Sequence, residues 1–430
     1  MAFFVHLLLL LYFTFLCLVN NVSHAQSSSY LLPVTKDDST LQYMTIISHG
    51  IPLVPTKLVV DLGGPLIWVD CASRFELSSS IHQIPNLSIQ CLTAKTHENG
   101  SHICLPSPRN PTHEDQLCEI FPENSITRTV ATKGELVEGI IDFKPIDSSE
   151  TGTIKHLVFS CTSTFLLNGL ASGAKGMLGL GRTRISLPSQ ISNTFNTQRK
   201  FNLCLSSSNG VIIFDAKPHD SYFGADILRS LTYTPLITYH GHKSSQDYFI
   251  NVKFIKINGK KLALNTSLLA NDQVGIGGTK LSTIAPYTTM ESSIFSLFTK
   301  AFVKAATHMN MTMVDPVAPF AHCFNSRGID STQIGPNVPI IDLVLQSEMV
   351  KWRIYGRNSM VQLGEEVMCL GFLDGGLKPN NRIVIGGYQL EDTLVQFDLG
   401  NSMLGFSPSL LKRQSTCSDF KFFGMPKASF

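Results

Sequence analysis

Short runs of β-branched and aromatic residues, separated by Gly, Pro, Asn or Ser, recur along most of the chain. Clear examples are LVVD at 58–61, GVIIF at 210–214, DYFINV at 247–252 and NRIVIG at 381–386. Such runs predict strands, because these residue types fit a pleated, half-buried surface. From Glu291 to Met309 the apolar residues recur at helical spacing instead, which predicts a surface helix. The pattern therefore predicts a mainly β protein.

The pattern also repeats approximately between the two halves of the chain. Each half has a strand that leads into a Gly-rich turn, at Lys57–Val69 and Gly275–Thr288, and a later apolar segment with glycines, at Gly176–Arg182 and Arg382–Ser407. Two lobes of like topology would bring the turns face to face across a cleft. We expect the junction near Ser221–Thr234, an N-terminal lobe over residues 26–225 and a C-terminal lobe over 226–430.

The first 25 residues are set apart by an apolar run from Phe3 to Val19, which ends in small residues at Ser23 and Ala25. This pattern predicts a secretory signal over residues 1–25, although no Lys or Arg lies near the start. A retained membrane anchor is the alternative, but the run is short for a spanning helix. Because no later stretch is long enough to span a bilayer, we expect the mature chain outside the cell and away from the membrane.

Nine of the ten cysteines follow this leader: Cys71, Cys91, Cys104, Cys118, Cys161, Cys204, Cys323, Cys369 and Cys417. In an oxidising compartment they would form up to four bridges and leave one thiol over. Sequons for N-glycosylation at Asn86, Asn99, Asn265 and Asn310 fit the same compartment.

The charge balance excludes some partners. A formal net charge of +2 suits an acidic matrix but gives no density of charge for phosphate, so we expect no nucleic acid partner. The histidines are scattered and the cysteines lack paired C-x-x-C spacing, so we expect no metal site. The GLGRTR stretch lacks the context of a nucleotide fingerprint, and we expect no cofactor. Its glycines are interpreted as close-packing positions beside the Asp61 turn.

Several long strings carry a family resemblance: FPENSITRTVATKGELVEG, ASGAKGMLGLGRTRISLPSQ, GGTKLSTIAPYT, VAPFAHCF, VPIIDLVLQSE and IVIGGYQLEDTLVQFDL. On these strings nearly the whole mature chain resembles the pepsin-like aspartic proteases. More narrowly it resembles the plant extracellular dermal glycoproteins, a group that includes xyloglucan-specific endoglucanase inhibitors, wheat-type xylanase inhibitors and legume basic 7S globulins. The resemblance implies a mainly β, bilobal fold with a central cleft between two lobes of the six-stranded-barrel type.

Pepsin-like catalysis needs two facing carboxylates that share one proton, each in an Asp-Thr/Ser-Gly turn. The first turn keeps Asp61, but Leu62 replaces the hydroxyl residue that helps tie the turns together. In the second turn Ser282-Thr283-Ile284 stands in place of Asp-Thr/Ser-Gly, and a serine hydroxyl cannot share a proton with Asp61.

The flap-like region from Ile126 to Gly139 has no Tyr, and Arg128 stands near its expected place. Of the other nearby acids, Asp70, Asp142 and Asp215, none lies in a turn aimed at the cleft by this resemblance. We therefore predict no catalytic residues, and interpret Asp61 and Ser282 as remnants of the pair. Asp61 is expected to be a buried carboxylate that turn N–H groups hold.

The resemblance implies binding to microbial glycoside hydrolases through loops of the C-terminal lobe. A guanidinium can bridge the two carboxylates of a glycosidase cleft, so an inhibitor needs an exposed Arg or Lys on a firm loop. The candidate segments are Asn325–Asn337 and Lys412–Cys417. Gln333 stands where such inhibitors carry Arg, and either Arg327 or Arg413 could replace it. The alternative for both arginines is a solvated loop charge, which is what we expect of Lys412.

The resemblance also implies disulfides between Cys323 and Cys369, Cys204 and Cys417, and Cys71 and Cys161. Cys91, Cys104 and Cys118 are then left for one further pair, with one thiol unpaired.

Three functions follow as hypotheses. The first is a secreted inhibitor of a microbial endoglucanase or xylanase in plant defence, located in the apoplast or cell wall, with cell-wall polysaccharide as a further candidate partner. The second is a storage or stress-related globulin without a hydrolase target, which Gln333 favours. The third is an active aspartic endopeptidase, against which Ser282 counts directly.

Overall fold

The computed structural model describes residues 29–71, 80–99, 117–145, 152–214, 223–238, 246–264, 269 and 278–419. The predicted signal over residues 1–25 therefore lies outside the described residues, as do Cys104, Asp215 and Asn265.

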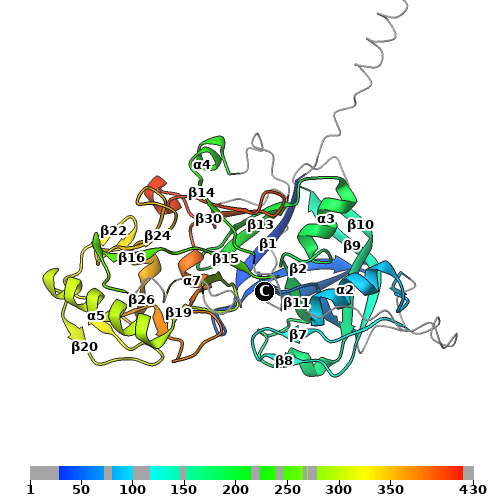
Figure 1. Ribbon diagram of the computed structural model, residues 1–430, viewed down its shortest axis with the longest axis horizontal. Helices are drawn as coiled ribbons and strands as arrows, with labels where there is room; N and C mark the ends of the chain where they lie inside the picture. Colours follow the sequence, from blue (N-terminus) through cyan, green and yellow to red (C-terminus); the bar gives the residue numbers. More distant parts are fainter. Residues whose placement is uncertain are drawn as a thin grey trace, which may run out of the picture.

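The strands of the N-terminal half form a closed, barrel-like sheet (Figure 1). β1 and β2 pair with each other and both also pair with β9, which joins the two ends of the run β1-β2-β3-β11-β4-β10-β9. Leu58 and Val60 point into the main core. Val59 between them is also fully buried, in a second cluster on the other face, so this strand is covered on both sides. The strands are β1 (Tyr30–Lys36), β2 (Tyr43–His49), β3 (Val54–Asp61), β4 (Trp68–Asp70), β9 (Gly134–Pro145), β10 (Gly152–Thr162) and β11 (Gly176–Gly179).

Shorter elements cover this barrel. α3 (Leu187–Phe195) packs against β10, and its buried Leu187 and Ile191 belong to the main core. The others are β5 (His82–Gln83), α2 (Ile89–Asn99), β6 (Glu119–Ile120), β7 (Glu123–Asn124), β8 (Thr129–Val130) and η2 (Thr164–Leu167).

The C-terminal half is built from smaller sheets, and one long helix packs against them on the outer side of the lobe (Figure 1). The predicted helix is confirmed as α5 (Ser292–His308), whose Glu291 side chain caps the first turn and whose buried face includes Phe298 and Phe302. The sheets have the orders β15-β18-β29-β19-β28, β17-β16-β24-β25, β20-β21-β27-β26 and β22-β23.

The remaining C-terminal bounds are as follows. The strands are β15 (Tyr248–Ile250), β16 (Phe254–Ile257), β17 (Lys260–Lys261), β18 (Thr279–Leu281), β19 (Thr288–Met290), β20 (Met313–Val314), β21 (Cys323–Asn325), β22 (Ser331–Thr332), β23 (Gly335–Pro336), β24 (Ile341–Val344), β25 (Lys351–Ile354), β26 (Met360–Leu363), β27 (Val367–Leu370), β28 (Phe372–Asp374) and β29 (Ile383–Ile385). The short helices are α6 (Gly356–Ser359), α7 (Gly387–Leu390) and η5 (Leu410–Arg413).

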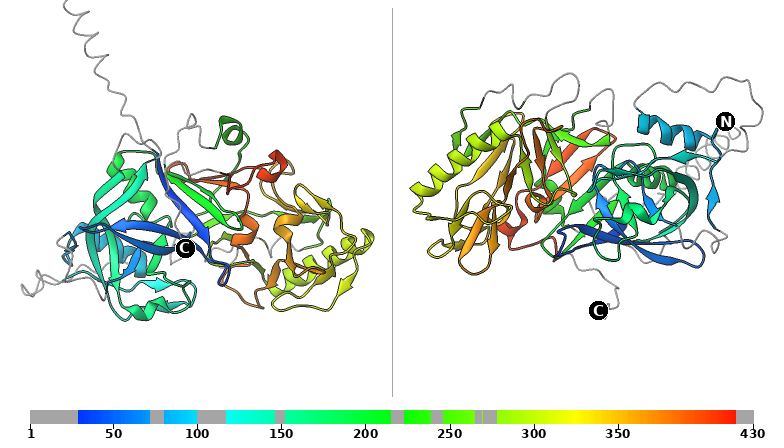
Figure 2. Two further views of the ribbon diagram at one scale, coloured as in Figure 1. Left: turned by 180° about the vertical axis from the view of Figure 1, so that it is seen from behind. Right: turned by 90° about the horizontal axis from the view of Figure 1, so that it is seen from below.

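One continuous sheet joins the two lobes (Figures 1 and 2). Its order there is β14-β31-β30-β12-β13-β1, formed by β12 (Lys200–Cys204), β13 (Asn209–Phe214), β14 (Thr232–Pro235), β30 (Leu394–Asp398) and β31 (Met403–Phe406). α4 (Ala225–Arg229) leads into β14. Across the β12–β30 pair, Phe201 and Phe397 stack with ring centroids 4.6 Å apart. The last strands of the chain are thus part of the sheet that begins in the N-terminal lobe.

The described residues contain four disulfides, between Cys71 and Cys161, Cys91 and Cys118, Cys204 and Cys417, and Cys323 and Cys369. Three of them are the pairs that the resemblance implied, and the structure completes the set by joining Cys91 to Cys118. Cys204–Cys417 ties strand β12 to the segment after η5, so it also crosses between the two halves of the chain.

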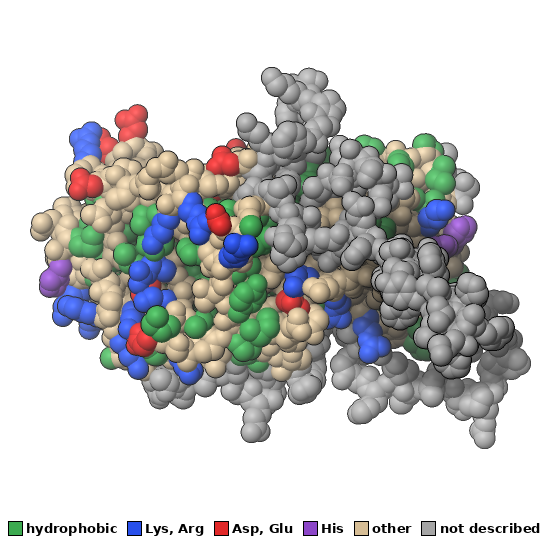
Figure 3. Space-filling view, turned by 90° about the horizontal axis from the view of Figure 1, so that it is seen from above, with side chains coloured by type: hydrophobic (Ala, Val, Ile, Leu, Met, Phe, Trp, Pro, Cys, Tyr) green, Lys and Arg blue, Asp and Glu red, His purple; other side chains and the backbone are tan. Residues whose placement is uncertain are grey.

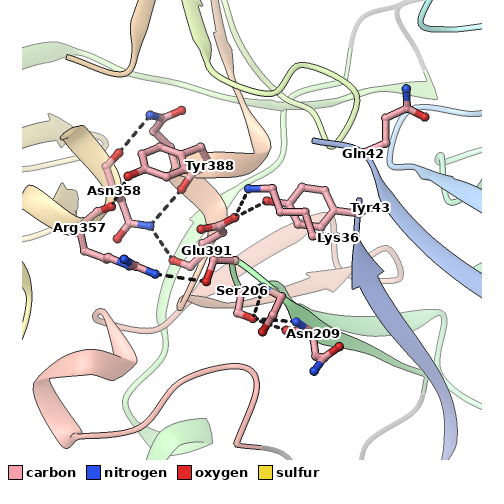
Figure 4. A network of polar contacts seen from close by, with 12 residues as sticks. Lys36, Gln42, Tyr43, Ser206, Asn209, Arg357, Asn358, Tyr388 and Glu391 are labelled. Carbon is pink, nitrogen blue, oxygen red and sulfur yellow. Dashed lines mark hydrogen bonds and ion pairs between the residues drawn. The ribbon is translucent and has the colours of Figure 1, made fainter. Parts of the chain in front are cut away.

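A buried polar network adds to the contact between the lobes (Figure 4). Lys36 Nζ on β1 lies 2.6 Å from Glu391 Oε1, and the two side chains are 9% and 1% exposed. The Tyr43 hydroxyl donates to the same Glu391 oxygen at 2.8 Å, and Lys36 lies over the rings of Tyr43 and Tyr388. A buried pair of this kind is stable only when its partners stay together, since either charge alone would be desolvated without compensation.

We predict that Lys36→Met lowers the free energy of unfolding by about 3 to 5 kcal/mol, because the Glu391 carboxyl would remain buried without its partner. The double variant Lys36→Met/Glu391→Gln should lose less than the sum of the single variants, since Tyr43 can still donate to the amide oxygen. Urea unfolding measures both, with the exposed Lys300→Met as a control near zero. Strict additivity of the two single changes would contradict the pairing.

Candidate functional site

The first Gly-rich turn follows strand β3 and holds a buried carboxylate. Asp61 is 5% exposed, and its Oδ1 accepts a hydrogen bond from Gly63 N at 3.0 Å. Leu180 N donates to the backbone oxygen of Asp61 at 2.9 Å. A Cβ at Gly179 or Gly181 would collide with backbone oxygens of this turn. The interpretation of these glycines as close-packing positions is thereby confirmed.

The second turn follows strand β18 and repeats the geometry of the first. Ser282 Oγ accepts from Ile284 N at 3.1 Å and from Ala285 N at 3.2 Å, as the Asp61 carboxylate accepts from its own turn. β18 pairs in parallel with β29 as β3 pairs in parallel with β11. Ser282 therefore occupies the position that corresponds to Asp61.

Thr283 links the two turns directly. Its hydroxyl accepts from Leu62 N at 3.1 Å and donates to Val60 O at 2.6 Å, and its side chain is 2% exposed. Leu62 holds the matching place in the first turn but has no hydroxyl, so the reciprocal bonds cannot form. Only one half of a two-way link between the turns is present.

A hairpin closes over Asp61. β7 and β8 form this hairpin, and Ser125 at its tip donates a hydrogen bond to Asp61 Oδ2. Asn124 anchors the hairpin by donating to Leu166 O and Asn168 O at 2.8 and 2.9 Å. Arg128 lies at the same tip, in the left-handed region with φ 56°. The contact from Ser125 was not predicted from the sequence, because the expected flap began one residue later at Ile126.

A second carboxylate lies near Asp61, but not in the second turn. Asp247 Oδ1 is 2.7 Å from Lys280 Nζ, and it packs so closely against the Asp61 turn that a Cβ on Gly63 would collide with it. Burial raises the pKa of both Asp61 and Asp247, while the positive charge of Lys280 opposes this rise in both.

The acids considered from the sequence have other surroundings. Asp70 Oδ2 lies 4.0 Å from Lys175 Nζ, Asp142 accepts from the Thr153 hydroxyl, and Asp215 is outside the described residues. Asp247 could have been found from strand register, since it directly precedes β15 and Tyr248 pairs with Leu281, the residue before Ser282.

Within the described part of the chain, no three His, Cys, Asp or Glu side chains are grouped so that they could hold a metal ion. In the same residues, no helix is both long enough and apolar enough to cross a membrane.

The candidate binding segments of the C-terminal lobe meet at helix α6. Gln333 is exposed at the tip of the β22–β23 hairpin, which is fixed to α6 by a hydrogen bond from Arg357 N to Ile334 O at 2.9 Å. From η5, Lys412 Nζ lies 4.7 Å from the centroid of Tyr355, the residue before α6, and Arg413 beside it is exposed. Lys412 is thus exposed, as expected, but it also has an aromatic partner.

Arg357 is a further exposed cation between these segments, and no motif in the sequence pointed to it. Its guanidinium donates to Ser207 Oγ at 3.2 Å, and Figure 4 shows it beside Asn358 and the Glu391 network. Its place is fixed by α6, so tertiary structure rather than local pattern brings it to this surface.

Arg327 lies in different surroundings. It forms an ion pair with Glu366 and borders a pocket of about 360 Å³ at the end of α5. Asn310, one of the sequon residues, is exposed and lines the same pocket. The structure therefore groups Gln333, Lys412 and Arg413 around α6, and gives Arg327 its own acidic partner.

The other sequons differ in environment. Asn86 is half-buried and its side-chain oxygen accepts from Lys95 Nζ. Asn99 is the last residue of α2, and Asn265 lies outside the described residues.

The η5 segment is held in place by two hydrogen bonds to Asp392. Asp392 Oδ1 accepts from Cys417 N at 3.0 Å, and its backbone oxygen accepts from Leu410 N at 2.8 Å. Burial, with a smaller contribution from the charge of Glu391, raises the pKa of Asp392 to about 6. Together with Cys204–Cys417 these bonds make η5 a firmly supported loop.

We predict that Asp392→Asn removes part of the pH dependence of stability. A carboxyl whose pKa is raised in the folded state stabilises below its unfolded pKa, near 3.8, and this contribution is lost as the pH rises through about 6. The stability of the variant relative to the parent should therefore rise by about 1 to 3 kcal/mol between pH 4 and pH 7. Asparagine can still accept from Cys417 N.

Urea unfolding at each pH measures this difference, with Asp315→Asn, an exposed carboxylate, as the control. A pH-independent difference between parent and Asp392→Asn would contradict the assignment.

Two lobes joined by a shared sheet, with two facing turns that each follow a strand, define the pepsin-like aspartic protease fold. Comparison with known proteins agrees. The family model described as xylanase inhibitor N-terminal matches residues 43–214, and the xylanase inhibitor C-terminal model matches residues 247–408.

The similar proteins cover almost the whole chain. A Nicotiana benthamiana protein named probable aspartic proteinase GIP2 is 48% identical over 407 residues, which are 91% of each chain. The crystal structure of edgp matches with a TM-score of 0.83 and 46% identity, over 93% of this chain and 99% of that one. Basic 7S globulin from soybean matches with a TM-score of 0.77 and 32% identity, over 92% and 100%. The chain belongs to the xylanase-inhibitor family of aspartic-proteinase-like proteins, and the resemblance and fold class expected from the sequence are confirmed.

Proposed function

We propose that this protein is a secreted, catalytically inactive aspartic-protease homologue that binds and inhibits a microbial cell-wall glycoside hydrolase, either an endoglucanase or a xylanase. Its place of action would be the apoplast or cell wall, in plant defence. The observation that carries the proposal is the group of exposed cations on firmly held loops around α6, in a chain whose two facing turns carry Asp61 and Ser282 rather than two carboxylates.

Loss of catalysis is supported by the cleft. A proton shared between two carboxylates requires both to face the same water, and Ser282 supplies a hydroxyl that its own turn already engages. Asp247 does not replace the missing acid, because Lys280 neutralises it by a direct ion pair. The Ser125 hydroxyl, at the tip of the hairpin that covers Asp61, also donates a hydrogen bond to this carboxylate, on the side where a substrate peptide would need to lie.

Inhibition is supported by the surface around α6. A glycosidase cleft carries two carboxylates about 5 to 9 Å apart, and a guanidinium matches such oxygens with a planar fork of donors. Arg413 offers this fork from a loop that Cys204–Cys417 and Asp392 hold, so little side-chain and loop freedom is lost on binding. Arg357 on α6 is a further exposed cation, fixed next to the Gln333 hairpin by its bond to Ile334 O, and can supply charge that Gln333 lacks.

The decisive experiment measures inhibition of a panel of microbial xyloglucanases and xylanases by the secreted, glycosylated protein. We expect tight inhibition of at least one of them. Arg413→Ala should weaken it by about 2 kcal/mol, roughly 30-fold, as for a central interface arginine. Arg327→Ala is the matched control and should change it less than about threefold, since Glu366 already engages that side chain.

Other results of this experiment would indicate a different binding surface or a different function. Inhibition that depends on Arg327 and not on Arg413 would place the binding surface at the pocket beside α5. If no hydrolase is bound, the storage or stress-related globulin becomes the better hypothesis, which Gln333 at the hairpin tip favours because it lacks a charge.

We also predict that the protein does not cleave peptides between pH 3 and pH 6, and that Ser282→Asp alone does not restore cleavage. The Ser125 bond to Asp61 and the absent hydroxyl at Leu62 would both persist in that variant. A fluorogenic acid-protease substrate, with and without pepstatin, tests this; pepstatin-sensitive cleavage by the parent protein would overturn the argument.

A further inference from the structure

The outer sheet of the C-terminal lobe has one apolar and one basic face. In the order β17-β16-β24-β25, Ile255, Ile257, Trp352 and Ile354 point into the core and are buried. The alternate residues Phe254, Lys256 and Arg353 are partly exposed, because successive side chains of a strand point to opposite faces. The β16 and β25 side chains of this second face thus reach solvent, whereas Asp342 and Val344 on β24 between them are buried.

Strand register aligns charges across that face. Lys261 pairs with Lys256, Lys256 with Asp342, and Asp342 with Arg353, so four charged side chains form a row across four strands. Neighbouring strands lie about 4.8 Å apart, which spaces the row regularly. Lys253 and Lys351 lie beside it.

The two segments that form and flank this row carry a net positive charge. Among the described residues 251–264 and 340–354, six Lys or Arg side chains stand against two acids, Asp342 and Glu348, whereas the whole chain has a net charge of only +2. Arg353 binds Asp342 through two hydrogen bonds of 2.6 and 3.0 Å, and Glu348 pairs with Lys256. Lys260 and Lys261 are exposed, and neither forms an ion pair with an acidic residue in the described part of the chain.

Aromatic rings accompany these cations. Lys261 Nζ lies 4.3 Å and Lys256 Nζ 5.7 Å from the centroid of Phe254. The positive surface continues from Arg353 to Tyr355 and Lys412 at the edge of η5. Figure 3 shows Lys and Arg side chains gathered on the C-terminal lobe in the view from above. The surface is a sheet face rather than a pocket, which suits an extended polymer.

We propose that a basic surface binds an acidic polysaccharide built of uronate units. This surface consists of Lys256, Lys261, Lys351 and Arg353 on the second face, together with two exposed lysines at the ends of the same strands, Lys253 directly before β16 and Lys260 at the start of β17. Such a polymer carries a carboxylate on each sugar ring, to match a row of ammonium groups, and presents apolar ring faces that can pack on Phe254. The four disulfides of the described residues indicate an oxidising compartment outside the cytosol. In such a compartment acidic polysaccharides, rather than nucleic acids, are the polyanions available for binding. The site would hold the protein in an acidic matrix and is separate from the role proposed for Arg413.

The test measures binding of the full secreted protein to immobilised polygalacturonate at low and at 0.3 M salt. The triple variant Lys253→Gln/Lys260→Gln/Lys261→Gln should bind about 10- to 100-fold more weakly at low salt. The matched control Lys155→Gln/Lys300→Gln/Lys304→Gln removes the same charge from exposed lysines elsewhere and should change binding less than about threefold. Added salt should weaken binding of the parent, because exposed charges are screened.

Fully methyl-esterified polygalacturonate and a DNA duplex complete the experiment. The ester lacks the carboxylate charge and should not bind. Equal losses in both triple variants would overturn the proposal, since binding would then follow net charge alone. Equal binding of the esterified polymer, or tighter binding of DNA at the same salt, would also overturn it. Hydrolase inhibition by the Lys253 triple variant should remain at the parent level, which separates this site from the proposed function.

Discussion

The antiparallel pairing of β12 with β30 is the contact on which the rest of the structure depends. It joins a strand of the N-terminal half to one near the end of the chain, and it makes a single sheet of both lobes. Phe201 and Phe397 stack across it, and the Lys36–Glu391 pair and Cys204–Cys417 flank it. Because so many buried groups meet there, the lobes are held in one arrangement, with the Asp61 and Ser282 turns in contact through Thr283.

The two turns have similar hydrogen bonds although their side chains differ. The N–H groups of a tight turn need an acceptor, and Ser282 Oγ supplies one as a carboxylate would. Thr283 likewise keeps one half of the link between the turns. The residues that maintain backbone geometry are therefore retained, whereas Leu62 and Ser282 lack the groups that would complete a shared proton site. Ser125 and Lys280 then satisfy the acids that remain.

The C-terminal lobe presents its cations on rigid supports. η5 rests on Asp392 and a disulfide, the β22–β23 hairpin is fixed to α6, and the β16–β24–β25 sheet holds Lys256 and Arg353 in register. Charges placed in this way lose little freedom on binding. The two surfaces we propose, one for a hydrolase and one for a polyanion, meet near Tyr355, since Lys412 lies over its ring.

The sequence by itself determined the mainly β character, helix α5 and the two corresponding turns, because these follow from local periodicity and from residue identity in a known pattern. Strand register and tertiary packing decided the rest. Asp247 lies near Asp61 because β15 pairs with β18, and Ser125 contacts Asp61 because a hairpin folds over the turn. Arg357 lies near the Gln333 hairpin because α6 packs against it. Such contacts join residues far apart in the chain, and local pattern carries no information on which of them will meet.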